Sequence, residues 1–233
     1  MKSKRRLRPL LGTFVEIGIR HDAVDGNAAI NRAFEGIALI QSLMSFHDPA
    51  SDLSRLNNSP GEEMELHPLT VTVLQLALDA GRRDDVKLSG RRARLLKPVR
   101  ITLDGIAKGF AVDYAVALLK QSGITAGWIN AGGDLRVFGD MTLPVCRRER
   151  DGTIRPVGRL RDMAMATSSV LPGSSPDFPG WIVHPACGEA CRGTWSVLAK
   201  TAWRADALTK VAALVPSRLR QAEITRLGGQ LLQ

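Results

Sequence analysis

Cysteine is scarce in this chain of 233 residues, which contains only three. Three is an odd number for a disulfide framework, and a chain of this length does not need one to fold, which fits a reducing compartment. Long apolar runs are absent too, because no stretch approaches the roughly 18 consecutive apolar residues of a membrane-spanning helix. The basic start leads into “PLLGT” rather than into the apolar core of a signal peptide. These absences predict a cytoplasmic protein without a transmembrane segment, an export signal or a lipobox.

Aromatic residues are also few, at 5% of the chain with a single tyrosine. The formal net charge of +9 and the isoelectric point near 10.1 favour contact with polyanions, so nucleic acid has to be considered. The scattered aromatic residues form no platform on which bases could stack, and no zinc-finger, RNP or helix-turn-helix signature is present. We therefore expect no specific nucleic-acid partner, and a basic nucleic-acid-binding protein is kept as an alternative.

The chain does contain enough apolar sequence for a sizeable core. Hydrophobic residues make up 44% of it and charged residues 24%, which predicts one domain over residues 1–233 with a possible lobe at 140–195. The hydrophobic periodicity predicts an α+β fold in which antiparallel or mixed sheets pack against helices. Helices are expected at 28–44, 69–81, 107–121, 202–215 and 219–226. Strands are expected at 10–19, 99–103, 126–129, 135–138, 158–163 and 195–198, with hairpins or loops at 82–98 and 146–156 and a turn-rich stretch at 45–58.

The stretch from Asp104 to Gly109 opens the expected helix at 107–121 and combines an acid, two glycines and one lysine. A helix start leaves its first backbone N–H groups without partners, and glycine lets a ligand approach them closely. Lys108 can add a point charge for a phosphate. Glycine before a helix is also common for packing reasons alone, so this segment by itself is only a candidate anion site.

Two further segments carry polar groups that a packed core does not require. Asn130 and Asp134 flank the paired glycines that follow the expected strand at 126–129, where they could bond a ribose or a base; a simple tight turn is the alternative. Asp206 and Thr209 stand three residues apart and therefore share one helix face. Such a pair is usually an ordinary exposed one, but facing a phosphate it could hold Mg²⁺ through oxygen ligands.

Taken together and in this order, these segments resemble the ApbE family, the FAD:protein FMN transferases. The resemblance covers most of the chain and implies a mixed α/β fold of the ApbE type. It also implies that FAD is the substrate and that, with Mg²⁺, FMN is transferred to a threonine or serine of an acceptor protein with release of AMP. The segments that carry it are “RPLLGTFVEI” (8–17), “LMSFHDPASDLSRLN” (43–57), “LDGIAKGFAVDYAVALL” (103–119), “WINAGGDLRVFG” (128–139), “MATSS” (165–169), “WIVHPACGE” (181–189) and “WSVLAKTAWRADALTKVA” (195–212).

The resemblance also implies roles for individual positions. Beside the flavin ring would lie Met44, Phe46 and His47. Mg²⁺ would be held by the Gly105 carbonyl, Asp206 and a hydroxyl, for which Thr209 is the candidate. The nucleotide part would be lined by Lys108, Asp113, Asn130, Gly132, Gly133, Asp134 and Thr167.

Two positions depart from the family pattern, and both concern the chemistry. Trp181 stands where the family's “H-I-I-[DN]-P-x-T-G” segment has the histidine that would act as base. Tryptophan cannot accept a proton, so His184 is the candidate catalytic residue, provided that the chain bends there. Lys210 stands four residues after Asp206, where the family has the metal-binding hydroxyl, and Thr209 lies about 100° away around the helix. An ammonium at that place would replace the metal and leave phosphate binding insensitive to chelation.

The segment between the helix at 69–81 and the strand at 99–103 is also shorter than in the family, which removes one wall of the flavin pocket. Three functions stay open from the sequence. The first is Mg²⁺-dependent FMN transfer, the second is a non-catalytic FAD-binding or regulatory relative, and the third is the basic nucleic-acid-binding protein.

Overall fold

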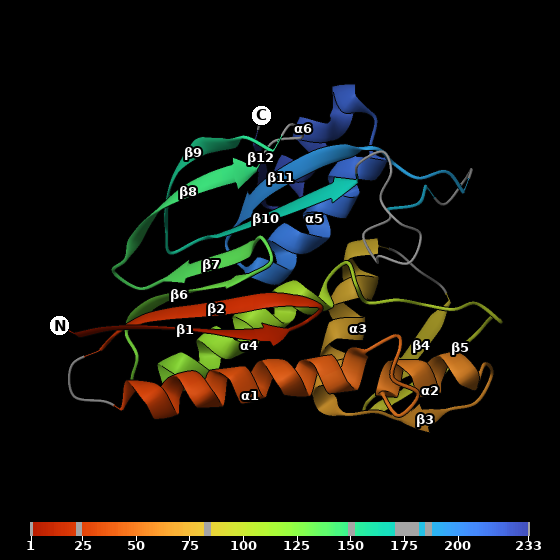
Figure 1. Cartoon of the computed structure of the whole chain (residues 1–233). Coiled ribbons are helices and arrows are strands. Elements are labelled where there is room, and N and C mark those ends of the chain that lie inside the picture. Colours follow the sequence, from red (N-terminus) through yellow and green to blue (C-terminus); the bar gives the residue numbers. More distant parts are fainter. Residues whose placement is uncertain are drawn as a thin grey trace.

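A seven-stranded antiparallel sheet forms the centre of the computed structural model (Figure 1), which describes residues 2–21, 25–81, 85–148, 152–170, 182–184 and 188–232. The strand order is β1-β2-β6-β7-β10-β11-β12, and every neighbouring pair is antiparallel. The bounds are β1 Lys2–Leu10, β2 Thr13–His21, β6 Ala126–Ala131, β7 Asp134–Phe138, β10 Ala164–Val170, β11 Gly193–Ala199 and β12 Gly229–Leu232. The sheet packs against helices, so the expected α+β class is confirmed.

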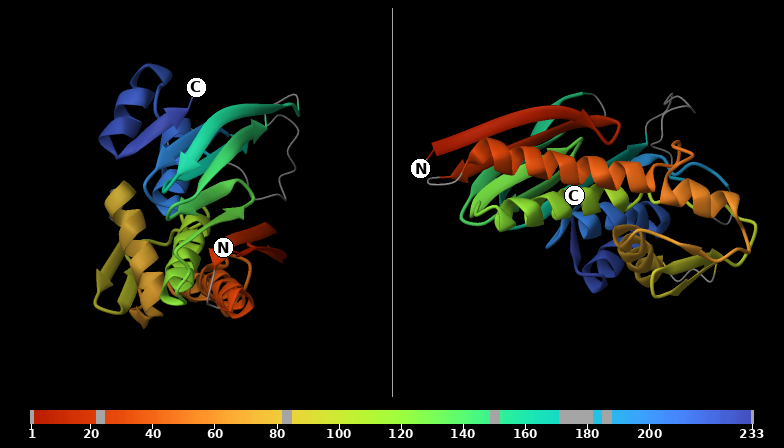
Figure 2. Two further views of the ribbon diagram at one scale, coloured as in Figure 1. Left: turned by 90° about the vertical axis from the view of Figure 1, so that its left-hand side faces the viewer. Right: turned by 90° about the horizontal axis from the view of Figure 1, so that it is seen from below.

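Helices cover the sheet in two groups. Helices α1 (Gly26–Met44) and α4 (Ala107–Gln121) lie side by side under its first half, and α5 (Ala202–Leu214) packs on β10 and β11 (Figures 1 and 2). Helix α6 (Ser217–Arg226) adjoins β12. Helix α1 begins where Asp25 accepts hydrogen bonds from two free backbone N–H groups, as an N-cap does. The five expected helices are confirmed.

Two smaller sheets flank the central one. Beside the short helix α2 (Asp52–Asn58) and helix α3 (Pro68–Gly81) lies a three-stranded sheet of β3 (Met64–Glu65), β5 (Arg92–Leu95) and β4 (Val86–Ser89). Strands β8 (Thr142–Arg148) and β9 (Ile154–Arg161) form a separate ribbon in which Cys146 pairs with Pro156. Both expected hairpins are therefore present.

The main core lies between strands β2 and β6 and the two helices α1 and α4. Ile17, Phe34 and Ile129 are fully or almost fully buried there, and burying one such side chain contributes about 1.5–3 kcal/mol. The two helices approach closely at Gly36, because a Cβ at this position would lie 2.3 Å from Cδ1 of Leu118. A second cluster joins β11, α5 and α6. Within the described residues, no helix is both long and apolar enough to cross a membrane.

The expected strand at 99–103 is wrong, and Asn57 gives the physical reason. The buried Asn57 side chain donates to the Ile101 carbonyl and accepts from the Ile101 N–H, each at 2.8 Å. A side chain therefore occupies the backbone groups that a neighbouring strand would otherwise use. The turn-rich stretch at 45–58 also contains helix α2, which Ser51 caps by accepting from the Ser54 N–H at 3.0 Å.

Strand β1 is missing from the expected elements because its residues are mostly basic. Arg6 donates to Asn31 on α1 at 2.7 Å, and the Arg8 guanidinium lies 4.7 Å from the centre of the Phe34 ring. The apolar stems of these arginines thus cover helix α1, although their charges suggest solvent. Strands β10 and β12 are also absent from the expected set.

The two hydrogen bonds of Asn57 to the backbone of Ile101 predict that this side chain stabilises the fold. Asn57→Ala leaves both backbone groups of the buried Ile101 unpaired and should lower the free energy of unfolding by about 1–3 kcal/mol in urea titrations. The matched control is Asn58→Ala, which removes the same side chain from the next, exposed position of α2. Equal effects of the two substitutions would contradict the role of Asn57.

Candidate functional site

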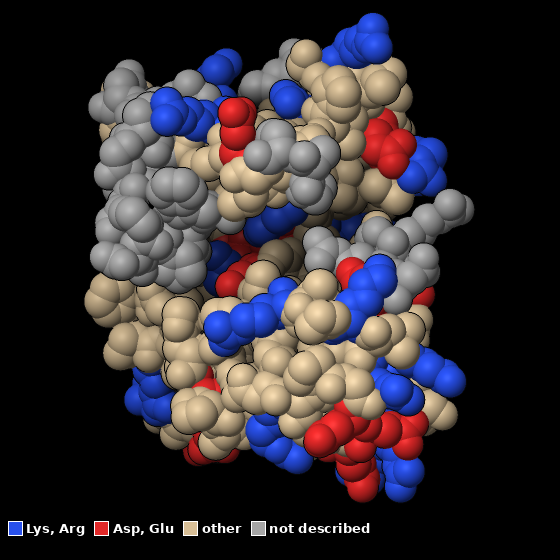
Figure 3. Space-filling view, turned by 90° about the vertical axis from the view of Figure 1, so that its right-hand side faces the viewer, with Lys and Arg blue, Asp and Glu red and all other residues tan. Residues whose placement is uncertain are grey.

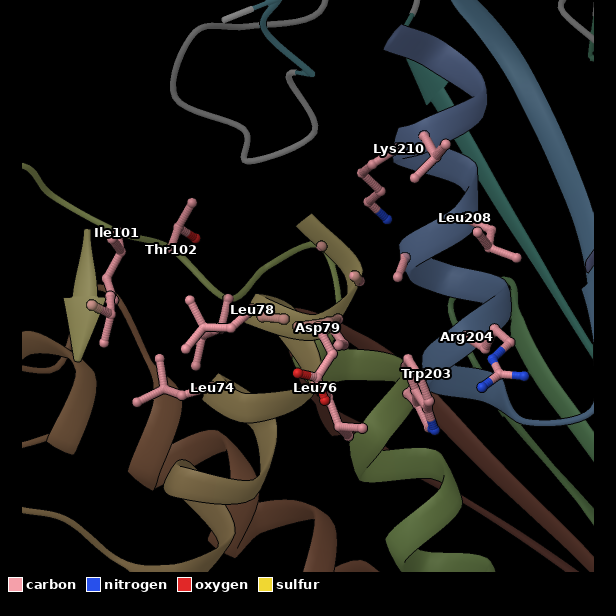
Figure 4. A pocket seen from close by; sticks show the side chains of 18 of the residues that line it. Leu74, Leu76, Leu78, Asp79, Ile101, Thr102, Trp203, Arg204, Leu208 and Lys210 are labelled. Carbon is pink, nitrogen blue, oxygen red and sulfur yellow. The ribbon is translucent and has the colours of Figure 1, made fainter. Parts of the chain in front are cut away.

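Two cavities flank the beginning of helix α4. The smaller, about 290 Å³, brings together Met44 and His47 from the end of α1 with Asp104 and Lys108 from the start of α4. The larger, about 450 Å³, lies between α3, the segment at 100–106 and α5 (Figure 4). Because Asp104 lines one cavity and Gly105 the other, the turn before α4 separates them. A hollow with basic and acidic side chains in its depth crosses one face of the molecule (Figure 3).

Two ion pairs lie at this turn. The ammonium of Lys108 is 3.1 Å from Oδ2 of Asp134, and the ammonium of Lys210 contacts Oδ1 of Asp206. The two carboxylates are almost completely buried, with 3% and 1% of their side chains exposed, whereas the lysines keep 33% and 27%. We call these four residues the acid–lysine quartet. Its negative charges face the protein interior and its positive charges reach toward the cavities.

Close contact between the starts of α4 and α5 holds the quartet in place. A Cβ at Gly109 would lie 2.5 Å from the Ala202 carbonyl oxygen, so only glycine fits between the two helices. The Gly109 N–H donates to Oδ2 of Asp206 at 3.1 Å. The Asp113 carboxylate accepts from the N–H groups of Ala202 and Trp203 at 3.0 and 2.9 Å, which caps the free start of α5.

Asp113 therefore has a clear structural role. Burial raises its pKa, and this outweighs the opposing effects of its two backbone hydrogen bonds and of Arg136, whose Nε lies 3.8 Å away. Its expected contact with the nucleotide stays a prediction.

The turn between β6 and β7 positions Asp134. Gly132 and Gly133 have φ values of 59° and 105°, a left-handed conformation that glycine adopts without strain. The Asn130 side chain accepts from the Gly133 N–H at 3.0 Å and closes the turn. A Cβ at Gly132 would lie 2.6 Å from Oγ1 of Thr13, whereas Gly133 faces open space. The “INAGGD” motif thus aims a buried carboxylate at Lys108.

Electrostatics at the quartet reflect burial and mutual charge. Burial raises the pKa of Asp134 to about 7, with a further contribution from the Asp206 charge that Lys108 and Lys210 only partly offset. Burial lowers the pKa of Lys108, but the charges of Asp134 and Asp206 outweigh it and leave the pKa raised. The short distance of 3.1 Å between the Lys108 ammonium and Oδ2 of Asp134 lets the opposite charges attract strongly, and this attraction stabilises the pair.

Hydroxyl groups complete the site on the α5 side. Thr209 Oγ1 lies 2.7 Å from Oγ of Ser168 and also donates to the Asp206 carbonyl at 2.7 Å. Thr167 instead pairs with Ser196 at 2.8 Å, because neighbouring residues of β10 point to opposite faces. Ser168 also accepts from Lys210 at 3.1 Å. Sequence reasoning missed Ser168, although its place in the quoted “MATSS” segment was the available signal.

Four of the expected site residues line a cavity, namely Met44, His47 and Lys108 in the smaller one and Gly105 in the larger one. Phe46 and His184 are among those that line neither. Phe46 packs edge-on against the His47 ring, with centroids 5.8 Å apart, and lies under the Arg100 guanidinium. His184 lies beside the isolated bridge of Val183 with Ala190, where its backbone N–H donates to the Glu189 carbonyl at 2.8 Å. Its role as catalytic residue stays a prediction. Trp181 lies outside the described residues.

The fold and the quartet together define an α+β protein with two buried acid–lysine pairs at a helix start between two cavities. A model of the ApbE family matches residues 11–89 and 83–228. The chain belongs to the ApbE family. No curated protein sequence matches it.

Solved structures share the fold at low sequence identity. The ApbE protein of Thermotoga maritima superposes with a TM-score of 0.86 at 21% identity, covering 99% of this chain and 93% of that one. The flavin transferase ApbE of Vibrio cholerae gives 0.79 at 18%, covering 99% and 96%. The flavinyl transferase ApbE of Pseudomonas stutzeri gives 0.78 at 16%, covering 97% and 88%. These likenesses extend over nearly the whole of each chain.

The raised pKa of Asp134 predicts a pH-dependent stability. Between its ordinary value of 3.8 and about 7, the folded protein holds a proton that the unfolded chain has released. The stability of the wild type relative to Asp134→Asn should therefore fall as pH rises through this window. Urea unfolding at several pH values measures it, with the exposed Asp140→Asn as control. A difference between wild type and Asp134→Asn that does not change with pH would argue against this assignment.

Proposed function

We propose that this chain binds FAD at the quartet and transfers its FMN part to a threonine or serine hydroxyl of an acceptor protein, with release of AMP. The observation that carries the proposal is the smaller cavity, where Met44 and His47 meet Lys108 although they lie far apart in the sequence. These are three of the residues for which the resemblance to the ApbE family implies contact with FAD. Membership of the ApbE family, and the names of the Vibrio and Pseudomonas structures as transferases of flavin, support it further.

The binding role of each part follows from its chemistry. Met44 offers a polarizable apolar surface for a ring system. The Ala107 and Gly109 N–H groups at the start of helix α4 already donate to the Leu103 carbonyl and to Asp206. The ammonium of Lys108, which lines the smaller cavity, can donate to phosphate oxygens there. The buried Asp134 carboxylate orients Lys108 from the protein interior, so its negative charge does not face the ligand.

Transfer needs one bond to form and one to break. The acceptor hydroxyl oxygen attacks the phosphorus of the FMN part, and the bond from that phosphorus to the bridging oxygen breaks. AMP leaves with the bonding electrons, and the hydroxyl proton passes to a base. We assign this base to His184, since Trp181 has no proton-accepting atom. The lysine ammonium groups of the quartet stabilise the negative charge that develops on the leaving phosphate.

A second candidate is a protein that binds FAD without transferring FMN. The contact of Lys210 with Asp206 favours it, because the ammonium occupies the carboxylate that the resemblance assigns to Mg²⁺. The tryptophan at the expected base position favours it as well. Binding of FAD is common to both candidates, and only the covalent product distinguishes them.

Transfer is tested by incubating the purified chain with FAD, Mg²⁺ and a peptide that carries a flavinylation threonine. The transferase should produce fluorescent flavin covalently attached to the peptide, together with an equal amount of AMP. FAD that binds without either product supports the second candidate. Neither binding nor product, combined with salt-sensitive retention of RNA, would instead support the basic nucleic-acid-binding alternative.

The position of Lys108 in the smaller cavity predicts that its charge strengthens the binding of FAD. Lys108→Ala removes a charged donor from the smaller cavity and should weaken FAD binding by about 10- to 100-fold, measured by quenching of flavin fluorescence. Lys120→Ala, on the exposed far end of the same helix, is the matched control and should leave the affinity unchanged. If both variants bind FAD as the wild type does, Lys108 does not contact the ligand.

A further inference from the structure

Lys210 lies among the residues that the resemblance assigns to a divalent cation. Its ammonium contacts Oδ1 of Asp206 and donates to Ser168 at 3.1 Å, and Ser168 in turn bonds Thr209. Its aliphatic chain runs along Gly105, where an added Cβ would lie 3.5 Å from Cγ of the lysine and 3.6 Å from Cε. Figure 4 shows the side chain leaving α5 toward the larger cavity. The ammonium thus reaches two of the three expected ligands, Asp206 directly and Thr209 through one hydroxyl, while the aliphatic chain lies beside the third, Gly105.

The other side-chain oxygens expected to bind the cation are already engaged in hydrogen bonds. Oδ2 of Asp206 accepts from the Gly109 N–H, and Thr209 donates to the Asp206 carbonyl. Mg²⁺ demands a near-octahedral set of oxygens at about 2.0–2.1 Å, and a dication beside a fixed ammonium is repelled by it. The residues present do not fit Mg²⁺.

We propose that the Lys210 ammonium takes the place of the divalent cation, so that Lys108 and Lys210 together bind the pyrophosphate of FAD without a metal. The proposal rests on the FAD binding proposed above. Each lysine is anchored from behind by a buried carboxylate and keeps about a third of its side chain or somewhat less exposed. Lys210 has three N–H donors, of which Asp206 and Ser168 each engage one, so one remains for a phosphate oxygen. Lys108 and Lys210 line different cavities on either side of the turn at 104–105, so the proposal places the pyrophosphate across that turn, with one phosphate toward each ammonium.

The test compares FAD binding in Mg²⁺ and in EDTA, measured by flavin fluorescence on the full chain. The wild type should bind with the same affinity in both. Lys210→Thr replaces the ammonium by a hydroxyl four residues after Asp206, and should bind about tenfold or more weakly in EDTA and recover in Mg²⁺. Lys210→Arg keeps the charge, and its binding should stay insensitive to EDTA.

Removing Lys210 leaves the buried Asp206 unpaired, so Lys210→Thr requires a check of folding by circular dichroism. A second measurement avoids this risk by using Mn²⁺ as a paramagnetic probe of the wild type. Mn²⁺ should not bind at Asp206, so any Mn²⁺ binding by the wild type should remain in Asp206→Asn. Mn²⁺ binding that Asp206→Asn abolishes, or FAD binding by the wild type that EDTA abolishes, overturns the role of Lys210 while the proposed function stands. No FAD binding in either buffer overturns both.

Discussion

The close approach of helices α4 and α5 is the constraint on which the rest of the site depends. Gly109 admits the backbone of α5, and the Asp206 side chain next to this contact is almost completely buried. A carboxylate taken out of water costs several kcal/mol unless hydrogen bonds and an opposite charge compensate it. The Gly109 N–H and the Lys210 ammonium supply that compensation. The packing of two helices thus dictates where one of the site's positive charges must stand.

Asp134, like Asp206, is a buried carboxylate paired with a partly exposed lysine. A glycine turn rather than a helix contact buries this carboxylate, and Lys108 compensates it. Because both acids lie behind the lysines, the ammonium groups are positioned before any ligand arrives, and the ligand does not have to order two flexible side chains. Burying this carboxylate disfavours its charged form, which appears as the raised pKa of Asp134.

The sequence predicts those parts of the molecule in which local signals and packing agree. Helix α4 falls at the expected bounds, because its apolar spacing, its starting glycines and its closing Ser122–Gly123 all point to one element. The segment at 99–103 reads as a strand for the same local reasons, but a side chain from α2, over 40 residues away, takes its hydrogen bonds. The four-residue spacing of Asp206 and Lys210 on one helix makes their contact predictable. The partnership of Ser168 with both Lys210 and Thr209 crosses from a strand to a helix, and no local pattern encodes it.

An ammonium and a magnesium ion differ in what they do to a pyrophosphate. Both attract its oxygens, but the ammonium carries half the charge and donates directed hydrogen bonds, whereas the metal is a Lewis acid that draws electrons from two oxygens at once. The first property is sufficient for binding, and the second mainly lowers the barrier to breaking the bond. Replacing one by the other therefore costs more in cleavage than in affinity. A tryptophan at the place of the expected base acts in the same direction, since an aromatic ring can pack against a ligand but cannot take its proton. In the proposed function, both departures therefore impair the transfer of FMN more than the binding of FAD, and they leave the stabilisation of the leaving phosphate to the ammonium groups of Lys108 and Lys210.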